Sequence, residues 1–149
     1  MKPEKINEMT LRFVSRSANE GFARAAAAAF IAQLDPTVEQ LYDIKTAVSE
    51  AVTNAIVHGY RDTLGTITVT VRLFSPAAAE IVVRDKGCGI PDVAQAREPL
   101  FTTGGADRSG MGFTIMESFM DKLTVRSVPG KGTTVQMRKR IAARMSTGR

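Results

Sequence analysis

Residues 66–90, TITVTVRLFSPAAAEIVVRDKGCGI, contain the pattern that decides the expected fold. From Thr66 to Leu73, apolar residues alternate with threonines and an arginine, which is the period of a strand that buries one face. A turn at Ser75-Pro76 separates this run from a second apolar run over Glu80–Arg84. The two runs predict an antiparallel hairpin whose buried face holds Ile67, Val69, Val71 and Leu73.

A strand and a helix are predicted near the start of the chain. Residues 9–14 alternate apolar and polar side chains, and Ser17 with Glu20 has the spacing of a capping box at a helix start. The alanine-rich helix that follows is expected to reach about Leu34. Its inward face is expected to hold Phe22, Ala26, Ala29 and Phe30.

A second capping box, Thr37 with Gln40, opens a helix that is expected to run to about His58, with Gly59 as its C-terminal cap. After the hairpin, the sequence predicts a loop and then further elements. These are a short helix over residues 111–120 and two strands over 123–128 and 133–139, joined by a turn at Pro129-Gly130.

The order of these elements indicates the fold class. It predicts an α/β (α+β) two-layer sandwich, with a mixed, mostly antiparallel sheet that helices cover on one face. We expect one domain over residues 1–140 and a basic tail over 141–149.

The composition narrows the class of protein. The chain has 149 residues, 44% of them hydrophobic, and only one cysteine and one histidine, which disfavours a disulfide framework or a zinc site. No apolar run approaches the roughly 20 residues that span a bilayer, so we expect a cytoplasmic protein without membrane contact. The net charge of +5 is carried by residues 138–149, because residues 1–137 hold equal numbers of acidic and basic side chains. We therefore expect no direct nucleic-acid binding.

Polar residues recur at every fourth position in EAVTNAIVHG, residues 50–59. Glu50, Asn54 and His58 therefore share one flank of the predicted helix. A carboxylate and a carboxamide one turn apart can serve a hard cation, or the carboxylate can act as a general base. A solvated polar stripe is the alternative reading.

A second motif, DKGCGI over residues 85–90, directly follows a predicted strand. Asp85 can accept a hydrogen bond from an exocyclic amine, and Gly87 and Gly89 let a flat ligand approach the backbone. A plain β-turn is the alternative.

A third motif, RSGMGF over residues 108–113, leads into the predicted short helix. A glycine-rich helix start offers N–H groups and a positive dipole end to phosphate, and Arg108 can add a charge-assisted contact. The motif matches neither a Walker A loop nor the dinucleotide fingerprint. The fourth segment, GKGTT over 130–134, is by itself only a hairpin turn.

In this order, the four segments resemble the GHKL ATPase superfamily with its Bergerat ATP-binding fold. Within it, the chain is most similar to the anti-sigma factor serine kinases of the sporulation type, with the stress-response type as the alternative. The similarity covers nearly the whole chain and is carried by Ser49–Ala55, Pro99–Thr103, Arg108–Glu117, Arg16-Ser17 and Phe22–Arg24.

This resemblance implies a role for each motif. Glu50 would be the general base toward a serine hydroxyl, and Asn54 would ligate Mg²⁺. Asp85 would bind the adenine amine of ATP, with Thr133 nearby through water. Residues 102–110 would form a lid over ATP, with Arg108 toward the γ-phosphate. The remaining nucleotide contacts would come from His58, Gly87, Gly89, Thr102, Thr103, Ser109, Gly110, Met111, Gly112 and Phe113.

The implied function is an ATP-dependent serine kinase that sequesters a sigma factor, phosphorylates its anti-anti-sigma antagonist and forms a homodimer. Arg24 would lie on the surface shared by the two protein partners. A sigma-binding module that uses ATP as a structural ligand is the alternative, although it would need no base at Glu50. A detached histidine kinase domain is disfavoured because the only histidine, His58, lies in the nucleotide-site helix.

Overall fold

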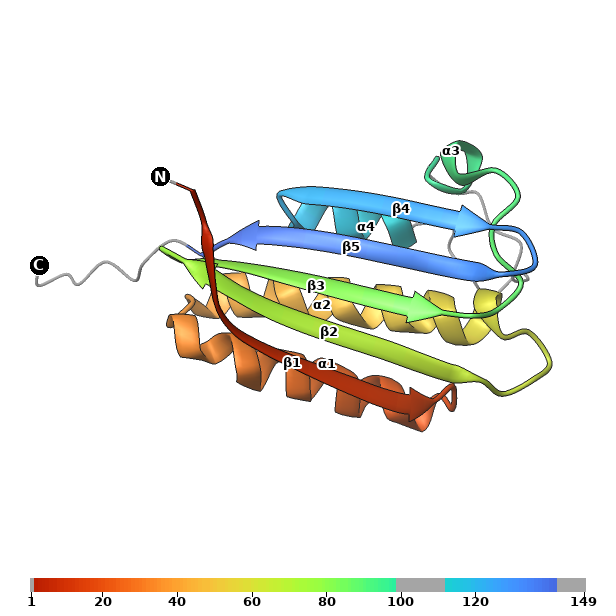
Figure 1. The fold of residues 1–149 in the computed structure, drawn as a ribbon, viewed down its shortest axis with the longest axis horizontal. Coiled ribbons are helices and arrows are strands. Elements are labelled where there is room, and N and C mark those ends of the chain that lie inside the picture. Colours follow the sequence, from red (N-terminus) through yellow and green to blue (C-terminus); the bar gives the residue numbers. More distant parts are fainter. Residues whose placement is uncertain (1, 99–111, 142–149) are drawn as a thin grey trace, which may run out of the picture.

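The computed structural model describes residues 2–98 and 112–141, which form a five-stranded sheet and the helices that cover it (Figure 1). The sheet order is β1-β2-β3-β5-β4, and each of the four pairings is antiparallel. The strands are β1 (Glu4–Val14), β2 (Thr66–Ser75), β3 (Ala78–Asp85), β4 (Lys122–Val128) and β5 (Gly132–Arg140). The α+β class is confirmed, and the described sheet has no parallel pair where a mixed sheet was expected.

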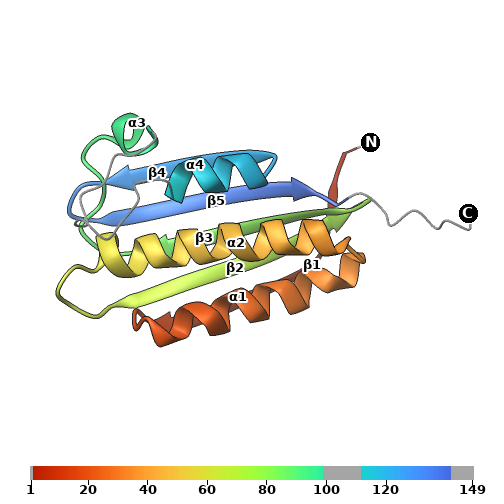
Figure 2. The same cartoon turned by 180° about the vertical axis from the view of Figure 1, so that it is seen from behind.

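The helices lie on one face of the sheet and leave the other face uncovered (Figure 2). The long helices are α1 (Ala18–Ile31) and α2 (Val38–Asn54), with α4 (Gly112–Phe119) beside α2. Shorter turns are a 3₁₀ turn (Ala32–Leu34), a π turn (Ala55–Gly59) and α3 (Val93–Ala96). This two-layer arrangement confirms the expected covering of one face. Among the described helices, none is long and apolar enough to cross a membrane.

The hairpin of β2 and β3 forms as the alternation predicts. Ile67, Val69, Val71 and Leu73 are buried under the helices, while the threonines between them lie on the uncovered face. Burial of four such aliphatic side chains contributes about 1.5–3 kcal/mol each relative to exposure. The hairpin therefore anchors the core, and it places the end of β3 at the rim of the helical layer.

Helix α2 begins as predicted but ends differently. The Gln40 N–H donates to Thr37 Oγ1 at 3.1 Å and the Thr37 N–H donates to Gln40 Oε1 at 2.9 Å, which completes the capping box. The α-helix stops at Asn54, and a π turn over Ala55–Gly59 continues it. The Tyr60 N–H accordingly donates to the Ala55 carbonyl, five residues back, at 3.0 Å. This widened turn lies within the first sequence motif.

The sequence prediction for α1 is wrong in two respects. Ser17 makes no side-chain cap, because its backbone is already helical (φ −59°, ψ −30°) rather than extended. The Glu20 side chain instead interacts with Ser49 of α2 and with Arg24 one turn along α1. The inward face is also shifted: Phe22 is 58% exposed and Ala29 is exposed, whereas Phe30 packs against the core as predicted. The buried side chains are Ala23, Ala27, Ala28 and Ile31. Small alanines at these positions let α1 approach α2 and the sheet closely, which phenylalanines would prevent.

The end of the described chain also differs from the expected boundary. Ile141 is 2% exposed, belongs to the hydrophobic core, and donates its N–H to the Ala77 carbonyl at 2.9 Å. The packed domain therefore includes a residue that the sequence analysis assigned to the tail.

Candidate functional site

Asp85 lies at the end of β3, at the rim of the helical layer. Its carboxylate accepts the Gly87 N–H at 2.9 Å and is also hydrogen-bonded by the backbone of Thr133. Burial raises the pKa of Asp85 above its ordinary value, and the two backbone donors oppose that rise. A partly buried carboxylate at the end of a strand can accept a hydrogen bond from a ligand N–H.

Three glycines from distant segments close around Asp85. A methyl group added to Gly59 would lie 2.8 Å from the Asp85 carboxyl carbon. One added to Gly87 would lie 2.0 Å from the Gly59 carbonyl oxygen, and one added to Gly132 would lie 2.1 Å from the Asp85 carbonyl oxygen. No larger residue fits at these points without displacing backbone or the carboxylate. The structure thus joins the first, second and fourth sequence motifs around one side chain.

Backbone hydrogen bonds hold the loop after Asp85 in place. The Cys88 N–H donates to the Gly59 carbonyl at 2.9 Å, and the Gly130 N–H donates to the Cys88 carbonyl at 2.7 Å. Gly89 has a φ of +78°, and a methyl group there would lie 2.4 Å from the Val128 carbonyl oxygen. Gly87 and Gly89 therefore lie tightly against other segments of the same chain, at Gly59 and Val128. The approach of a flat ligand to these glycines stays a prediction.

A second group of polar atoms lies where α2 faces the start of α4. A methyl group added to Gly112 would lie 3.1 Å from Asn54 Nδ2, 3.2 Å from Asn54 Oδ1 and 3.4 Å from Glu50 Oε1. The structure thus brings Glu50 and Asn54 together against the third motif. Phe113, the next residue, is buried in the core and anchors this end of α4.

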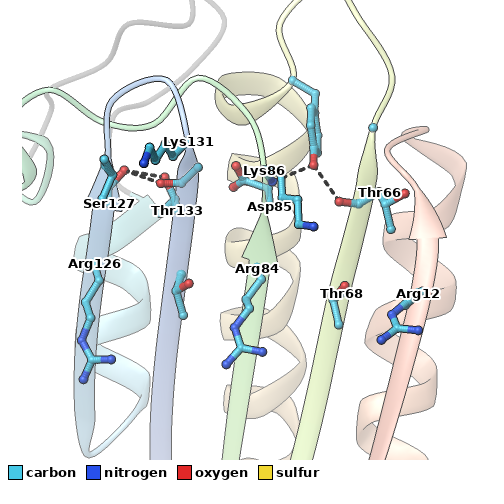
Figure 3. Close-up of a pocket in the computed structure, with 15 residues that line it drawn as sticks. Arg12, Thr66, Thr68, Arg84, Asp85, Lys86, Arg126, Ser127, Lys131 and Thr133 are labelled. Carbon is cyan, nitrogen blue, oxygen red and sulfur yellow. Dashed lines mark hydrogen bonds between the residues drawn. The ribbon is translucent and has the colours of Figure 1, made fainter.

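Thr133 takes part in a small hydroxyl network with Ser127, as Figure 3 shows. The two side-chain oxygens are 2.8 Å apart, and Ser127 Oγ also accepts the Ile90 N–H at 2.7 Å. Ser127 was not among the predicted site residues. A serine in the strand that pairs with β5 carries no local signal, because its role depends on the pairing of β4 with β5.

Tyr60 is a second residue that sequence reasoning missed. Its hydroxyl donates to the Thr66 carbonyl at 2.7 Å and accepts the Lys86 N–H at 2.7 Å, so it ties the start of β2 to the loop after β3 (Figure 3). Gly65 lies against the ring, where a methyl group would be 2.2 Å from a ring carbon. The sequence signal that could have indicated this role is the position of Tyr60 directly after Gly59, the predicted C-terminal cap of the helix.

Two other predicted residues have contacts of a different kind. His58 lies in the π turn, half-buried, and its carbonyl accepts the Cys88 thiol at 3.0 Å. Arg24 lies on α1, where it contacts Ser49 Oγ at 3.2 Å and Glu20 Oε2 at 3.3 Å. The remaining predictions fall outside the described residues: Thr102, Thr103, Arg108, Ser109, Gly110 and Met111. In the described ranges, no three His, Cys, Asp or Glu side chains are placed to hold a metal ion.

Comparison with known proteins places this arrangement in a family. Residues 13–139 match the histidine kinase-like ATPase domain. An anti-sigma F factor of Geobacillus kaustophilus is 56% identical over 138 residues, which covers 91% of this chain and 94% of that protein. An anti-sigma F factor of a Thermoanaerobacter species is 55% identical over 141 residues, with 94% and 98% covered.

Solved structures share the fold at lower identity. The RsbU and RsbW domains of Rv1364c from Mycobacterium tuberculosis match with a TM-score of 0.65 at 20% identity, over 91% of this chain and 32% of that one. Full-length ShkA in complex with AMPPNP matches with a TM-score of 0.55 at 19% identity, over 84% and 31%. Together with the sequence match over residues 13–139, these findings show that the chain belongs to the histidine kinase-like ATPase domain family, in the branch whose curated members are named anti-sigma F factors.

Proposed function

We propose that this protein binds ATP with Mg²⁺, transfers the γ-phosphoryl group to a serine of an antagonist protein, and sequesters a sigma factor. The observation that carries the proposal is the convergence of Gly59, Gly87 and Gly132 on Asp85, with Glu50 and Asn54 facing Gly112 nearby on α2. A carboxylate in a narrow backbone cradle suits a flat base, and the polar pair at a glycine-led helix start suits phosphates.

The chain has residues that would suit each part of the nucleotide: the adenine base, the phosphates and the bound Mg²⁺. Asp85 would accept the exocyclic amine of adenine, and Thr133 with Ser127 would hold a water beside it. Gly112 leaves room for phosphate oxygens beside Asn54, because a side chain there would crowd the carboxamide. The Asn54 oxygen would hold Mg²⁺, which neutralises charge on the phosphates when bound. Mg²⁺ sites of this kind need few protein ligands, since phosphates and waters supply the rest.

Glu50 would act as the general base in phosphoryl transfer. The acceptor serine hydroxyl gives its proton to a Glu50 carboxylate oxygen as the serine oxygen bonds to the γ-phosphorus. The bond from that phosphorus to the β–γ bridging oxygen breaks, and ADP leaves with the electron pair. A positioned base typically contributes about 10²–10⁴ in rate.

The partner assignment is supported by the curated relatives and by the surface of α1. The relatives are named anti-sigma F factors, and the chain covers more than nine-tenths of their length. Exposed Phe22 lies on α1 together with Glu20 and Arg24, an ion pair that also interacts with Ser49 of α2. An exposed aromatic beside an arginine is the composition that protein interfaces favour. We propose this surface as the contact for the sigma factor and its antagonist.

The test is phosphoryl transfer from γ-labelled ATP to a candidate antagonist, with the acceptor serine changed to alanine as the substrate control. Glu50→Gln keeps the shape of the side chain but removes its basicity, so we expect it to bind ATP and the sigma factor normally and to transfer phosphate about 10²-fold more slowly or worse. Transfer at the wild-type rate by Glu50→Gln would disprove the role of Glu50. Wild-type protein that holds the sigma factor with ATP but phosphorylates no antagonist would favour the binding-module alternative.

We also propose a homodimer formed through β1, which is an edge strand of the described sheet. An edge strand presents backbone N–H and C=O groups that a second copy can pair with. Light scattering of the nucleotide-bound protein should therefore give twice the chain mass. A monomer at tens of micromolar, a concentration at which specific dimers normally persist, would contradict this assignment.

A further inference from the structure

The uncovered face of the sheet carries a straight row of five residues, one from each strand. Arg12 pairs with Thr68, Thr68 with Arg84, Arg84 with Thr134, and Thr134 with Arg126. We call these five residues the arginine row. Because directly paired residues point to the same face, the three arginines alternate with two threonines on the side away from the helices.

The spacing of the arginine row follows from the sheet itself. Neighbouring strands lie about 4.8 Å apart, so successive arginines are separated by about 10 Å at their backbones. Figure 3 shows Arg12, Arg84 and Arg126 at one level of the sheet, each on a different strand. All three side chains are exposed.

These arginines differ from a neighbouring one that has partners. Arg72, on the same face, contacts Glu8 at 2.6 Å and Glu80 at 3.0 Å. Within the described part of the chain, Arg12, Arg84 and Arg126 have no carboxylate within 4.0 Å. On this face, the charge of Arg72 is therefore neutralised by carboxylates, whereas the charges of the arginine row are not.

The arginine row lines a shallow concavity of about 900 Å³, to which Lys86 and Lys131 add two more cations. The carboxylate among its lining residues is Asp85, which already accepts the Gly87 N–H. The concavity thus offers five basic groups and four threonine hydroxyls to an anionic ligand. Like charges gathered without acidic partners raise the local potential and attract negative surfaces.

We propose that the arginine row is a docking surface for an acidic surface of a partner protein. The row lies on the uncovered face, whereas Glu50, Asn54 and Gly112 lie on the helical side. Its concavity also includes Asp85 and Thr133, so the docking surface adjoins the adenine end of the proposed nucleotide site. Guanidinium groups bind carboxylates in a forked geometry, and the intervening threonines can donate to the same carboxylates. Sheet faces that bind single-stranded nucleic acid stack bases on aromatic side chains, and the row has none. A flat sheet face also has no element that could enter a duplex groove.

The experiment measures binding of labelled poly-L-glutamate to the full chain with ATP and Mg²⁺ present, over a series of salt concentrations. The test variant is Arg12→Gln/Arg84→Gln/Arg126→Gln. The matched control is Lys2→Gln/Arg16→Gln/Lys45→Gln, which removes the same charge from exposed side chains outside the arginine row. We expect the row variant to bind about tenfold more weakly than the control variant, as the loss of three exposed charge pairs implies.

ATP binding and the melting temperature of each variant establish that it is folded. If the triple variant does not fold, Arg84→Gln is compared with Arg84→Lys, which keeps the charge but not the forked donor geometry, and the first should lose more affinity than the second. Equal losses in the row and control variants would overturn the proposal, because binding would then follow net charge alone. Tighter binding of single-stranded DNA than of poly-L-glutamate, lost in the row variant, would also overturn it in favour of a nucleic-acid surface.

Discussion

At the scale of single residues, Asp85 combines a cost in stability with a use in binding. Burial raises its pKa, so the folded chain holds a proton on this carboxyl more readily than the unfolded chain does. This contribution to the free energy of folding is fully present below the ordinary pKa of an aspartate, and it is lost as the pH rises through the raised pKa of Asp85. At neutral pH the ionised carboxylate costs stability but remains a strong acceptor for a ligand amine.

Asp85→Asn should separate these two effects. The amide removes the buried charge, so the melting temperature of the variant relative to wild type should increase as the pH is raised from about 3 to 7. ATP affinity should fall, because Asn presents a weaker acceptor beside an N–H group of its own. Thermal denaturation across this pH range and calorimetric titration with ATP check the two parts. A melting-temperature difference that is independent of pH would show that the Asp85 charge carries no folding cost.

At the scale of elements, the two long helices begin with similar sequences but different caps. Thr37 and Gln40 form both bonds of the capping box, whereas Ser17 forms no side-chain cap and Glu20 contacts Ser49 and Arg24. A tertiary contact across to α2 therefore replaces a local contact in α1. The same spacing in sequence has two outcomes, because Thr37 has the extended backbone that a cap needs (ψ 164°), whereas the backbone of Ser17 is already helical (ψ −30°).

The two caps make a matched pair of variants. Thr37→Ala should lower the free energy of unfolding by about 1 kcal/mol, since it removes a helix cap. Ser17→Ala should change it much less, because no cap bond is lost. Urea unfolding of both variants under identical conditions is the measurement. An equal loss in both would mean that Ser17 caps α1 in solution.

At the scale of the whole molecule, the hydrophobic core includes Ile141, the last residue that the structure describes. Ile141 is buried against the sheet, and residues 142–149 follow it. Deletion of 142–149 should leave the melting temperature and ATP affinity nearly unchanged. Deletion of 141–149 should lower the free energy of unfolding by about a further 1.5–3 kcal/mol, because it also removes the buried Ile141 side chain. Chemical denaturation of the two truncations compares them directly, and equal stabilities would show that Ile141 contributes nothing to the core.

The sequence by itself determined the features that depend on local periodicity and on order along the chain. The alternation from Thr66 to Leu73 determined the hairpin and its buried face, and the Thr37–Gln40 box determined the start of α2. The order of the four motifs indicated the family. These features could be predicted because strand period and capping involve neighbours within a few residues.

The tertiary structure alone decided which distant residues meet. Gly59 and Gly132 close on Asp85, and Tyr60 joins β2 to the loop after β3, only because the strands pair in the order β1-β2-β3-β5-β4. Phe22 faces outward because the close approach of α1 to its neighbours requires alanine on the buried side. The arginine row likewise exists only through the register of four pairings. Each strand's sequence determines its own two faces, but strand order and register are set by the packing of the entire core, so cross-strand neighbours cannot be read from any one segment.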